Sequence, residues 1–468
     1  MRSLSARNRE LGYLFAAFLL TGAGFASVAI ARDQSVDDTS FVYVGYFAGV
    51  YILLHLALRW LVPRADPLIL PLVVTLSGIG LTVIYRIDPA QALRQAGWMV
   101  LSAVLLVVAL VVVRDHRQLE RSTYTLGLLG LLLLAGTAVF GTEINGAKLW
   151  IRVPGGQTLQ PGEFTKLCLI VFMAGYLRTH RELLANPPHR LLGIPLPSPK
   201  YYGPLVTITG ATLLAVVFLN DFGSGLLFFA VFLAMLYMAT NRATYAVIGL
   251  VIFAGASYAI YQGVPRIQDR VQHTWIDPYD DKDTCPQGFV ASGNYQPGSC
   301  GGYQSVQAIN SIAAGGLVGT GLGQGPGFSQ DEAARQSGLT FSFPELKTDF
   351  IFVVIATELG LVGAVAVLLI FVLFVFRALA IAQRAGDGFS KLLAGGLAAA
   401  FAIQTFLIIG GVTRMIPLTG ITLPFISYGG SSVLSNFLLV GLLLRISDRS
   451  ARDATSGETG TFPVLGGT

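Results

Sequence analysis

Long apolar segments recur along the whole chain and constrain its fold more than any other feature. Of the 468 residues, 53% are hydrophobic and 12% are charged, and the mean hydropathy is +0.65. A helix of ~20 apolar residues crosses the hydrocarbon core of a bilayer, where backbone groups must hydrogen-bond within the protein. This composition excludes an ordinary cytoplasmic enzyme, a disordered protein and a secreted disulfide scaffold. We therefore predict an all-α bundle of membrane-spanning helices.

Twelve segments are predicted to span the membrane, and together they form one integral-membrane domain over residues 1–446. The first has a basic start like a signal peptide but no clear small-residue cleavage site, so it is kept as a span. The polar residues 447–468 are predicted to form a disordered cytoplasmic tail. The predicted spans are Leu11–Ala31, Phe41–Val62, Leu68–Tyr85, Ala96–Val113, Thr123–Phe140, Glu163–Leu177, Gly203–Leu219, Gly223–Ala239, Ala243–Tyr261, Asp349–Phe376, Leu392–Val412 and Ser431–Leu444.

The distribution of Lys and Arg predicts the orientation of this bundle. With the N-terminus inside the cell, 19 of the 31 basic residues fall on the inner side, 11 on the outer side and Lys166 within a span. Short cytoplasmic loops carry the excess of positive charge in membrane proteins. Both termini are therefore predicted to be cytoplasmic, and the long segment 262–347 to lie outside with a short surface helix at Tyr303–Ala314. The net charge of +5 forms no dense basic block, so it indicates orientation rather than nucleic-acid binding.

Two of the three cysteines lie in the predicted outer segment. A disulfide between Cys285 and Cys300 would close about 15 residues and contribute ~3 kcal/mol, the alternative being two unrelated free thiols. Cys168 is predicted to be a packing residue inside a span. No His or Cys cluster has the spacing of zinc ligands. The acidic residues 277–281 favour a solvated turn over a divalent-cation site. The Gly-rich residues 319–325 lack the strand and the lysine of a nucleotide-binding loop.

Charged side chains at the ends of predicted spans form the strongest candidate site. Charges at these positions are costly and usually functional, although a single one can also reach water by extending along the helix. Glu358 lies nine residues beyond Asp349, which corresponds to ~14 Å deeper along a continuous helix. The other five fall at the same outer level, and we interpret them as a site: Glu163, Lys166, Asp221, Asp349 and Arg414.

Several motifs in a fixed order resemble the SEDS family of shape, elongation, division and sporulation proteins, whose members include RodA, FtsW and SpoVE. The resemblance covers roughly residues 145–446. The two additional N-terminal spans and the stretch from Arg114 to Leu119 resemble the elongation-type RodA members of actinobacteria most. The chain departs from the family pattern at Gly162, Lys347 and Thr357. The matching motifs begin or end at Asn145, Trp150, Gln160, Lys166, Asn220, Trp275, Gly302, Gly319, Lys347, Ile416, Leu423 and Ser432.

The resemblance implies a ten-span core, extended here by two spans, and an inverting peptidoglycan glycosyltransferase. It would polymerise lipid II, a disaccharide-peptide on undecaprenyl pyrophosphate, at the outer face of a bacterial plasma membrane for cell elongation. The implied partner is a class B penicillin-binding protein, and a Mg²⁺ or Mn²⁺ ion is possible. Asp349 is the expected general base. Supporting or pyrophosphate-binding roles are implied for Lys166, Glu163, Trp150, Arg152, Asp221, Lys347, Glu358, Arg414 and Ser431.

Three alternatives remain open at this point. A lipid II flippase would also use charges within the membrane, but these charges lie at one face rather than at the midplane. A non-catalytic scaffold leaves the buried charges unexplained. The division-type FtsW members are the third alternative. If Asp349 only caps a helix, the general base moves to Asp221 or Glu163.

Overall fold

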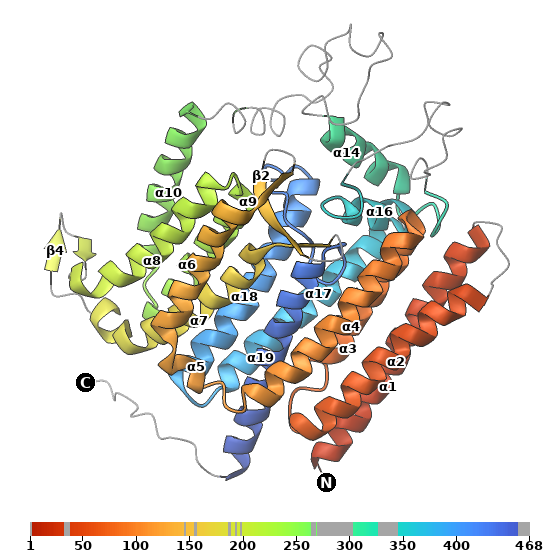
Figure 1. Ribbon diagram of the computed structural model, residues 1–468, viewed down its shortest axis with the longest axis horizontal. Coiled ribbons are helices and arrows are strands. Elements are labelled where there is room, and N and C mark those ends of the chain that lie inside the picture. The colour runs from red at the N-terminus through yellow and green to blue at the C-terminus, as the bar shows by residue number, and fades with distance from the viewer. Residues whose placement is uncertain are drawn as a thin grey trace, which may run out of the picture.

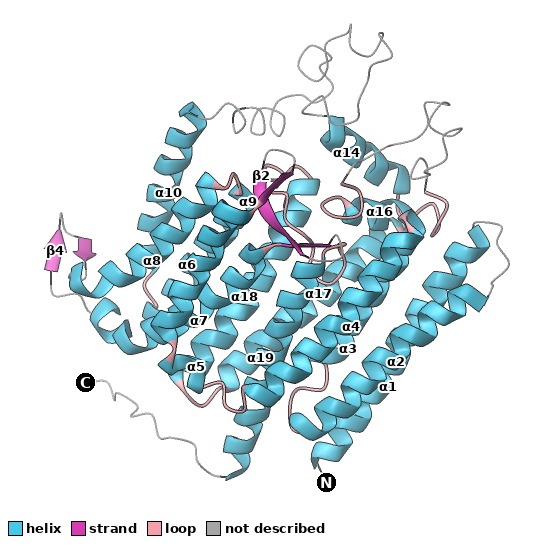
Figure 2. Cartoon of the chain, viewed as in Figure 1, coloured by secondary structure: helices cyan, strands magenta, loops and turns pink. Residues whose placement is uncertain are grey.

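The structure is a computed structural model, and it describes residues 2–31, 38–144, 147–153, 157–185, 189–191, 194–196, 199–263, 268, 303–325 and 345–456. Helices stand side by side in a bundle (Figures 1 and 2). This confirms the prediction of an all-α, multi-pass membrane protein. Within the described ranges, ten helices are long and apolar enough to cross a membrane. They are α1 (Arg2–Ala31), α2 (Asp38–Leu61), α3 (Ile69–Ile87), α4 (Pro89–Val112), α6 (Thr123–Phe140), α9 (Phe222–Thr240), α10 (Ala243–Gly263), α17 (Gly360–Arg384), α18 (Gly388–Val412) and α19 (Gly430–Ser456).

Two predicted spans correspond to helices outside that set. Helix α7 (Pro161–Ala185) carries several charged residues, and α8 (Pro199–Phe218) has a shorter apolar stretch. Yet α7 packs deep in the bundle, where Ile170, Phe172 and Met173 are fully buried. Its neighbours are α6, α9, α18 and α19. A helix surrounded by other helices does not contact lipid, so it can carry polar groups that a peripheral helix cannot.

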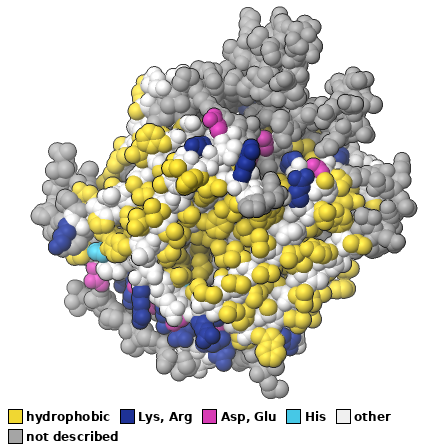
Figure 3. Space-filling model, viewed as in Figure 1, with side chains coloured by type: hydrophobic (Ala, Val, Ile, Leu, Met, Phe, Trp, Pro, Cys, Tyr) yellow, Lys and Arg dark blue, Asp and Glu magenta, His cyan; other side chains and the backbone are white. Residues whose placement is uncertain are grey.

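We name the two ends of the bundle after the elements found there (Figure 1). The α14 face holds α14 (Tyr303–Gly315), which confirms the predicted short helix in this part of the sequence. The α5 face holds α5 (Gln118–Arg121), the start of α1 and the end of α19. In Figure 3, hydrophobic side chains cover the middle of the visible surface, and Lys and Arg gather near the α5 face.

The tenth predicted span, Asp349–Phe376, is not one continuous helix. Helix α16 (Ile351–Glu358) ends just before α17, whose first residue, Gly360, has a φ of 66°. A side chain at Gly360 would collide with the backbone of Gly319, so glycine is required there. The first amides of α17 donate to the loop after α14: Leu361 N to Gly316 O at 3.0 Å and Val362 N to Leu317 O at 3.1 Å. The break is therefore stabilised by a distant segment, and periodicity alone could not reveal it.

A small antiparallel sheet, which we did not predict from the sequence, joins α6 to α7. Its strands are β1 (Thr142–Ile144), β2 (Ala147–Val153) and β3 (Gln157–Leu159), in the order β1-β2-β3. Trp150 faces Thr142 across the sheet, and Arg152 faces Thr158. The β-branched and aromatic residues of β2 suit such a strand. A two-stranded hairpin of β4 (His189–Leu191) and β5 (Ile194–Leu196) follows α7.

The last helix continues further than predicted. Helix α19 runs to Ser456, so the prediction of disorder is wrong for residues 447–456, while residues 457–468 lie outside the described part. Ser447 and Asp448 explain this extension because they accept hydrogen bonds from the backbone N–H groups of Asp66 and Arg64, at 3.0 and 2.8 Å. These bonds fix the end of α19 against the connection between α2 and α3.

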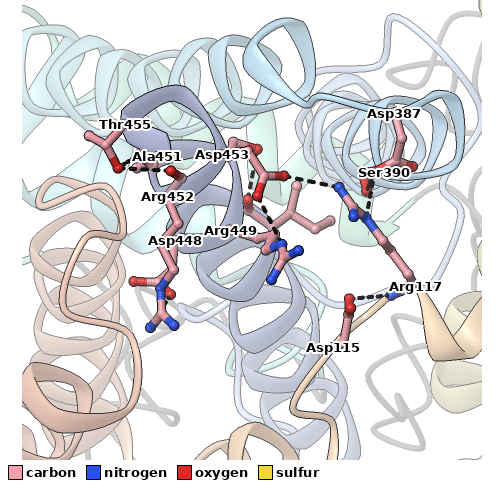
Figure 4. Close-up of polar contacts among 12 residues, drawn as sticks. Asp115, Arg117, Asp387, Ser390, Asp448, Arg449, Ala451, Arg452, Asp453 and Thr455 are labelled. Carbon is pink, nitrogen blue, oxygen red and sulfur yellow. Dashed lines mark hydrogen bonds and ion pairs between the residues drawn. The ribbon is translucent and has the colours of Figure 1, made fainter. Parts of the chain in front are cut away.

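An exposed network of ion pairs connects the helix ends at the α5 face (Figure 4). Arg117 contacts Asp387 and Asp453, both at 3.0 Å, and Arg449 reaches Asp453 at 3.0 Å. Asp387 is also the N-cap of α18, where it accepts from Ser390 N. The network ties the connection before α5 to the start of α18 and the end of α19.

Candidate functional site

A buried ion pair lies at the α14 face, at the start of α7. Lys166 Nζ donates to Glu163 Oε2 at 2.8 Å, and Ser435 Oγ of α19 donates to the same carboxylate oxygen at 2.9 Å. The side chains of Lys166 and Glu163 are only 2% and 10% exposed. Lys166 also donates to Gln404 Oε1 of α18 at 2.8 Å. Residues of α7 and α18 thus hold the ammonium group, and α19 holds its carboxylate partner. The predicted proximity of Glu163 and Lys166 is found.

Asp349 lies in the turn before α16, half-buried at the α14 face. Its N–H donates to Glu345 O at 3.1 Å. Helix α16 begins at Ile351, and its N-cap residue is Phe350, which makes no side-chain capping bond. Asp349 therefore does not occupy the capping position that would give its carboxylate a purely structural role. A side chain at Gly420 would come within 3.8 Å of Asp349 Oδ2, which places the segment between α18 and α19 beside this carboxylate.

That segment, residues 413–429, is fixed to the Asp349 turn by two hydrogen bonds. Ser427 Oγ donates to Thr348 O at 2.5 Å, and Tyr428 N donates to Lys347 O at 2.9 Å. Buried Gln95 of α4 holds the segment from the other side, because its amide donates to Ser427 O and accepts from Gly429 N. Burial raises the pKa of the Tyr428 phenol, with nearby Arg94 acting in the opposite direction. The backbone on both sides of Asp349 is thus held in place.

From a continuous helix we expected Glu358 to lie deep in a span. That prediction is wrong. Because α16 ends at Glu358, this carboxylate meets Arg86 at the end of α3, with 3.0 Å between Arg86 Nε and Glu358 Oε1. Glu358 Oε2 accepts from Gly323 N at 2.9 Å. Burial raises the pKa of Glu358, and Arg86 opposes that rise. This pair holds the Gly-rich residues 319–325 against α16, so Glu358 supports the segment that carries Asp349.

The remaining predicted residues occupy several places on the α14 face. Asp221 is the N-cap of α9 and accepts from Ser224 N at 3.0 Å, which gives it a structural role. Ser431 Oγ accepts from Gln160 N at 2.7 Å and so joins the start of α7 to that of α19. On β2, Trp150 is partly buried and Arg152 is exposed. Lys347 and Arg414 are half-buried, and the backbone of Arg414 has a φ of 60°.

Sequence reasoning missed Gln404, Ser435, Gln95 and Arg86 as members of this site. Only charges within spans were considered, although a glutamine in the apolar stretch of α18 is a comparable signal, since its amide needs partners inside a bundle. Cys285, Cys300 and the acidic residues 277–281 lie outside the described residues, so the disulfide remains a prediction. The described part of the chain contains no group of three or more His, Cys, Asp or Glu side chains that could hold a metal ion.

The fold is that of a multi-pass helical membrane protein with charged side chains buried inside the bundle. The model of the FtsW/RodA/SpoVE cell cycle protein family matches residues 60–452. The peptidoglycan glycosyltransferase RodA of Mycobacterium leprae is 38% identical, over 98% of this chain and 94% of that protein. The chain therefore belongs to the FtsW/RodA/SpoVE family, the SEDS family that the motifs indicated.

Two solved structures share the fold. A chain from a peptidoglycan synthase complex superimposes with a TM-score of 0.64 at 24% identity, covering 82% of this chain and 98% of that one. The rod shape determining protein RodA of Thermus thermophilus gives a TM-score of 0.53 at 23% identity, covering 84% and 98%. The family model starts at residue 60, so α1 and nearly all of α2 lie before it, whereas the mycobacterial relative matches nearly the whole chain.

Proposed function

We propose that this chain is a RodA-type peptidoglycan glycosyltransferase that polymerises lipid II at the α14 face. Family membership and the 38% identity to a mycobacterial peptidoglycan glycosyltransferase support this activity. The observation that carries the site is the convergence of the Asp349 turn, the segment 413–429 and the Glu163–Lys166 pair at one end of the bundle. Lipid II would enter sideways from the bilayer, which a membrane-embedded fold permits.

The proposed chemistry needs one base and a site for a leaving anion. The 4-hydroxyl oxygen of the acceptor sugar attacks the anomeric carbon of the donor, and the bond from that carbon to the pyrophosphate oxygen breaks, with inversion. Asp349 takes the hydroxyl proton. Undecaprenyl pyrophosphate leaves with the electron pair, and cationic side chains stabilise its charge. Lys166 is the first candidate, with Arg152, Lys347 and Arg414 as further ones. A Mg²⁺ or Mn²⁺ ion, when bound, would add positive charge at the pyrophosphate.

We further propose that the α14 face is extracytoplasmic and that α7 and α8 also span the membrane. Lys166 at the start of α7 lies at the α14 face, and Arg178 near its end pairs with Glu120 of α5. Twelve spans return the C-terminus to the side of the N-terminus, as the excess of basic residues near the α5 face favours. In intact cells that express a variant with the three native cysteines replaced, a cysteine at Val318, which is 77% exposed, should react with an impermeant maleimide. A cysteine at exposed Thr455 should react only after lysis; the reverse pattern would overturn this orientation.

A class B penicillin-binding protein is the proposed partner, since polymerised strands need cross-linking. The structural relative from a peptidoglycan synthase complex described as coordinating polymerization and crosslinking supports such an assembly. The decisive test of the activity is polymerisation of labelled lipid II by the purified protein in detergent. Glycan strands formed there cannot result from flipping, because detergent offers no second compartment. Failure of well-folded protein to make strands, with and without the partner, would reject the proposed function.

A further inference from the structure

Two different acceptors fix the orientation of the Lys166 ammonium group. It donates to the carboxylate of Glu163 and to the neutral amide oxygen of Gln404, both at 2.8 Å. An ammonium has three donors, so these two bonds fix the direction of the third. Gln404 is itself 1% exposed, on α18, and it accepts without adding a negative charge. A carboxylate at this position would instead leave Lys166 between two anions.

Gln404 makes a second contact that reaches the Asp349 region. Its Nε2 donates to Thr422 O at 2.9 Å, in the segment 413–429. The same segment carries Gly420, which lies beside Asp349, and Ser427, which donates to Thr348 O. One amide therefore links the Lys166 ammonium to the segment that adjoins the proposed base. Helices α7 and α18 pack against each other, so this bridge is short and buried.

We propose that Gln404 is a positioning residue for the reaction: it aims the third N–H of Lys166 at the substrate pyrophosphate and fixes Lys166 relative to Asp349. This inference rests on the proposed function, and it extends it by assigning a role to a residue that does not itself contact substrate. An apolar residue at this position would leave Lys166 with Glu163 alone, and the ammonium would turn toward that carboxylate. A misplacement of about 1 Å can reduce the rate of an enzyme ~10²-fold.

The test uses the intact protein in detergent and undecaprenyl pyrophosphate, which contains the leaving group but no sugar and cannot be polymerised. Gln404→Met preserves the length of the side chain and removes both hydrogen bonds. We expect it to weaken undecaprenyl pyrophosphate binding about 10-fold or more, and to leave binding of uncharged undecaprenol unchanged. In a Lys166→Met background, Gln404→Met should cause no further weakening, because the group that it positions is gone.

If Gln404→Met weakens undecaprenyl pyrophosphate binding equally with and without Lys166, the role of Gln404 is merely structural and the proposal is overturned. If Gln404→Met weakens binding in neither background, the proposal is overturned too. Thermal unfolding reports whether each variant folds. If Gln404→Met does not fold, Gln404→Glu keeps the size and the oxygen that faces Lys166. We expect Gln404→Glu to lose pyrophosphate binding through its added negative charge, and undiminished binding would contradict the proposal. Polymerisation by wild-type protein in parallel tests the proposed function separately.

Discussion

Helices α7, α18 and α19 each carry polar residues at both ends, and the two ends differ in how those residues meet water. At the α14 face, Lys166 is 2% exposed and Glu163 10%. At the α5 face, Arg117 is 36% exposed, its partner Asp387 24% and Arg178 48%. Exposed ion pairs change stability by only ~0–1 kcal/mol each. A buried pair is often no more stable than an apolar replacement, so stability alone does not account for the α14 cluster.

The same helices therefore serve two purposes. At the α5 face, the pairs of Arg117 and Arg178 are partly exposed and screened by water, although Asp448 of α19 is buried there. The helix ends at the α14 face hold charges away from water, where each charge needs its partner and acts strongly on a bound anion.

Asp349→Asn should nearly abolish glycan synthesis. Asparagine keeps the shape and removes the proton acceptor, and loss of a general base reduces the rate by ~10²–10⁴. The measurement is lipid II polymerisation by purified protein, with thermal unfolding as the check of folding. Since Phe350 rather than Asp349 is the N-cap of α16, the variant should fold normally. Near-normal polymerisation would move the base to Asp221 or Glu163.

Lys166→Ala should lose activity and stability together. It leaves the Glu163 carboxylate buried with a hydroxyl donor in place of an ammonium, and breaking a buried pair typically costs ~3–5 kcal/mol. Arg449→Ala is the matched control at the α5 face. Arg449 is 41% exposed and pairs with Asp453 on its own helix, so its loss should change stability by less than ~0.5 kcal/mol. Equal activity of the two variants would remove Lys166 from the site.

Arg86→Met should destabilise the α14 face without touching the proposed reacting groups. It leaves Glu358, 1% exposed, without its cation, at a cost on the order of 3 kcal/mol. Adding Glu358→Gln should restore much of that loss, because no buried charge then remains unpaired. Unfolding in detergent, followed for both variants, measures the difference. If the double variant is no more stable than Arg86→Met, the Arg86–Glu358 pair is not what supports α16.

Arg117→Ala should have a small effect, although Arg117 contacts two acids. Both pairs are partly exposed and screened, so we expect a loss of ~1 kcal/mol or less, smaller still at high salt. Polymerisation should be unchanged. A large loss of activity in well-folded Arg117→Ala protein would show that the two faces are coupled, which would contradict the division of roles described above.

Much of the architecture follows from local sequence. Eleven of the twelve predicted spans each fall on one helix and the tenth falls on two, because backbone groups in a bilayer must hydrogen-bond within the protein. The motifs that contain Lys166 and Asp349 also indicated the candidate site. Expectations failed where a distant segment intervenes: the Gly-rich loop breaks the predicted tenth span at Gly360, and Ser447 and Asp448 anchor a helical extension in place of a disordered tail.

The class of fold, the family and the proposed catalytic candidates could be predicted from the amino-acid sequence, because hydropathy and motifs are local properties. Which polar groups meet depends on how the helices pack. Arg86 and Glu358 are 272 residues apart, and Lys166 and Gln404 are 238 apart. Nothing local in the chain specifies these pairs. A buried polar group is stable only where another helix brings it a partner, and the packing of the whole bundle selects that partner.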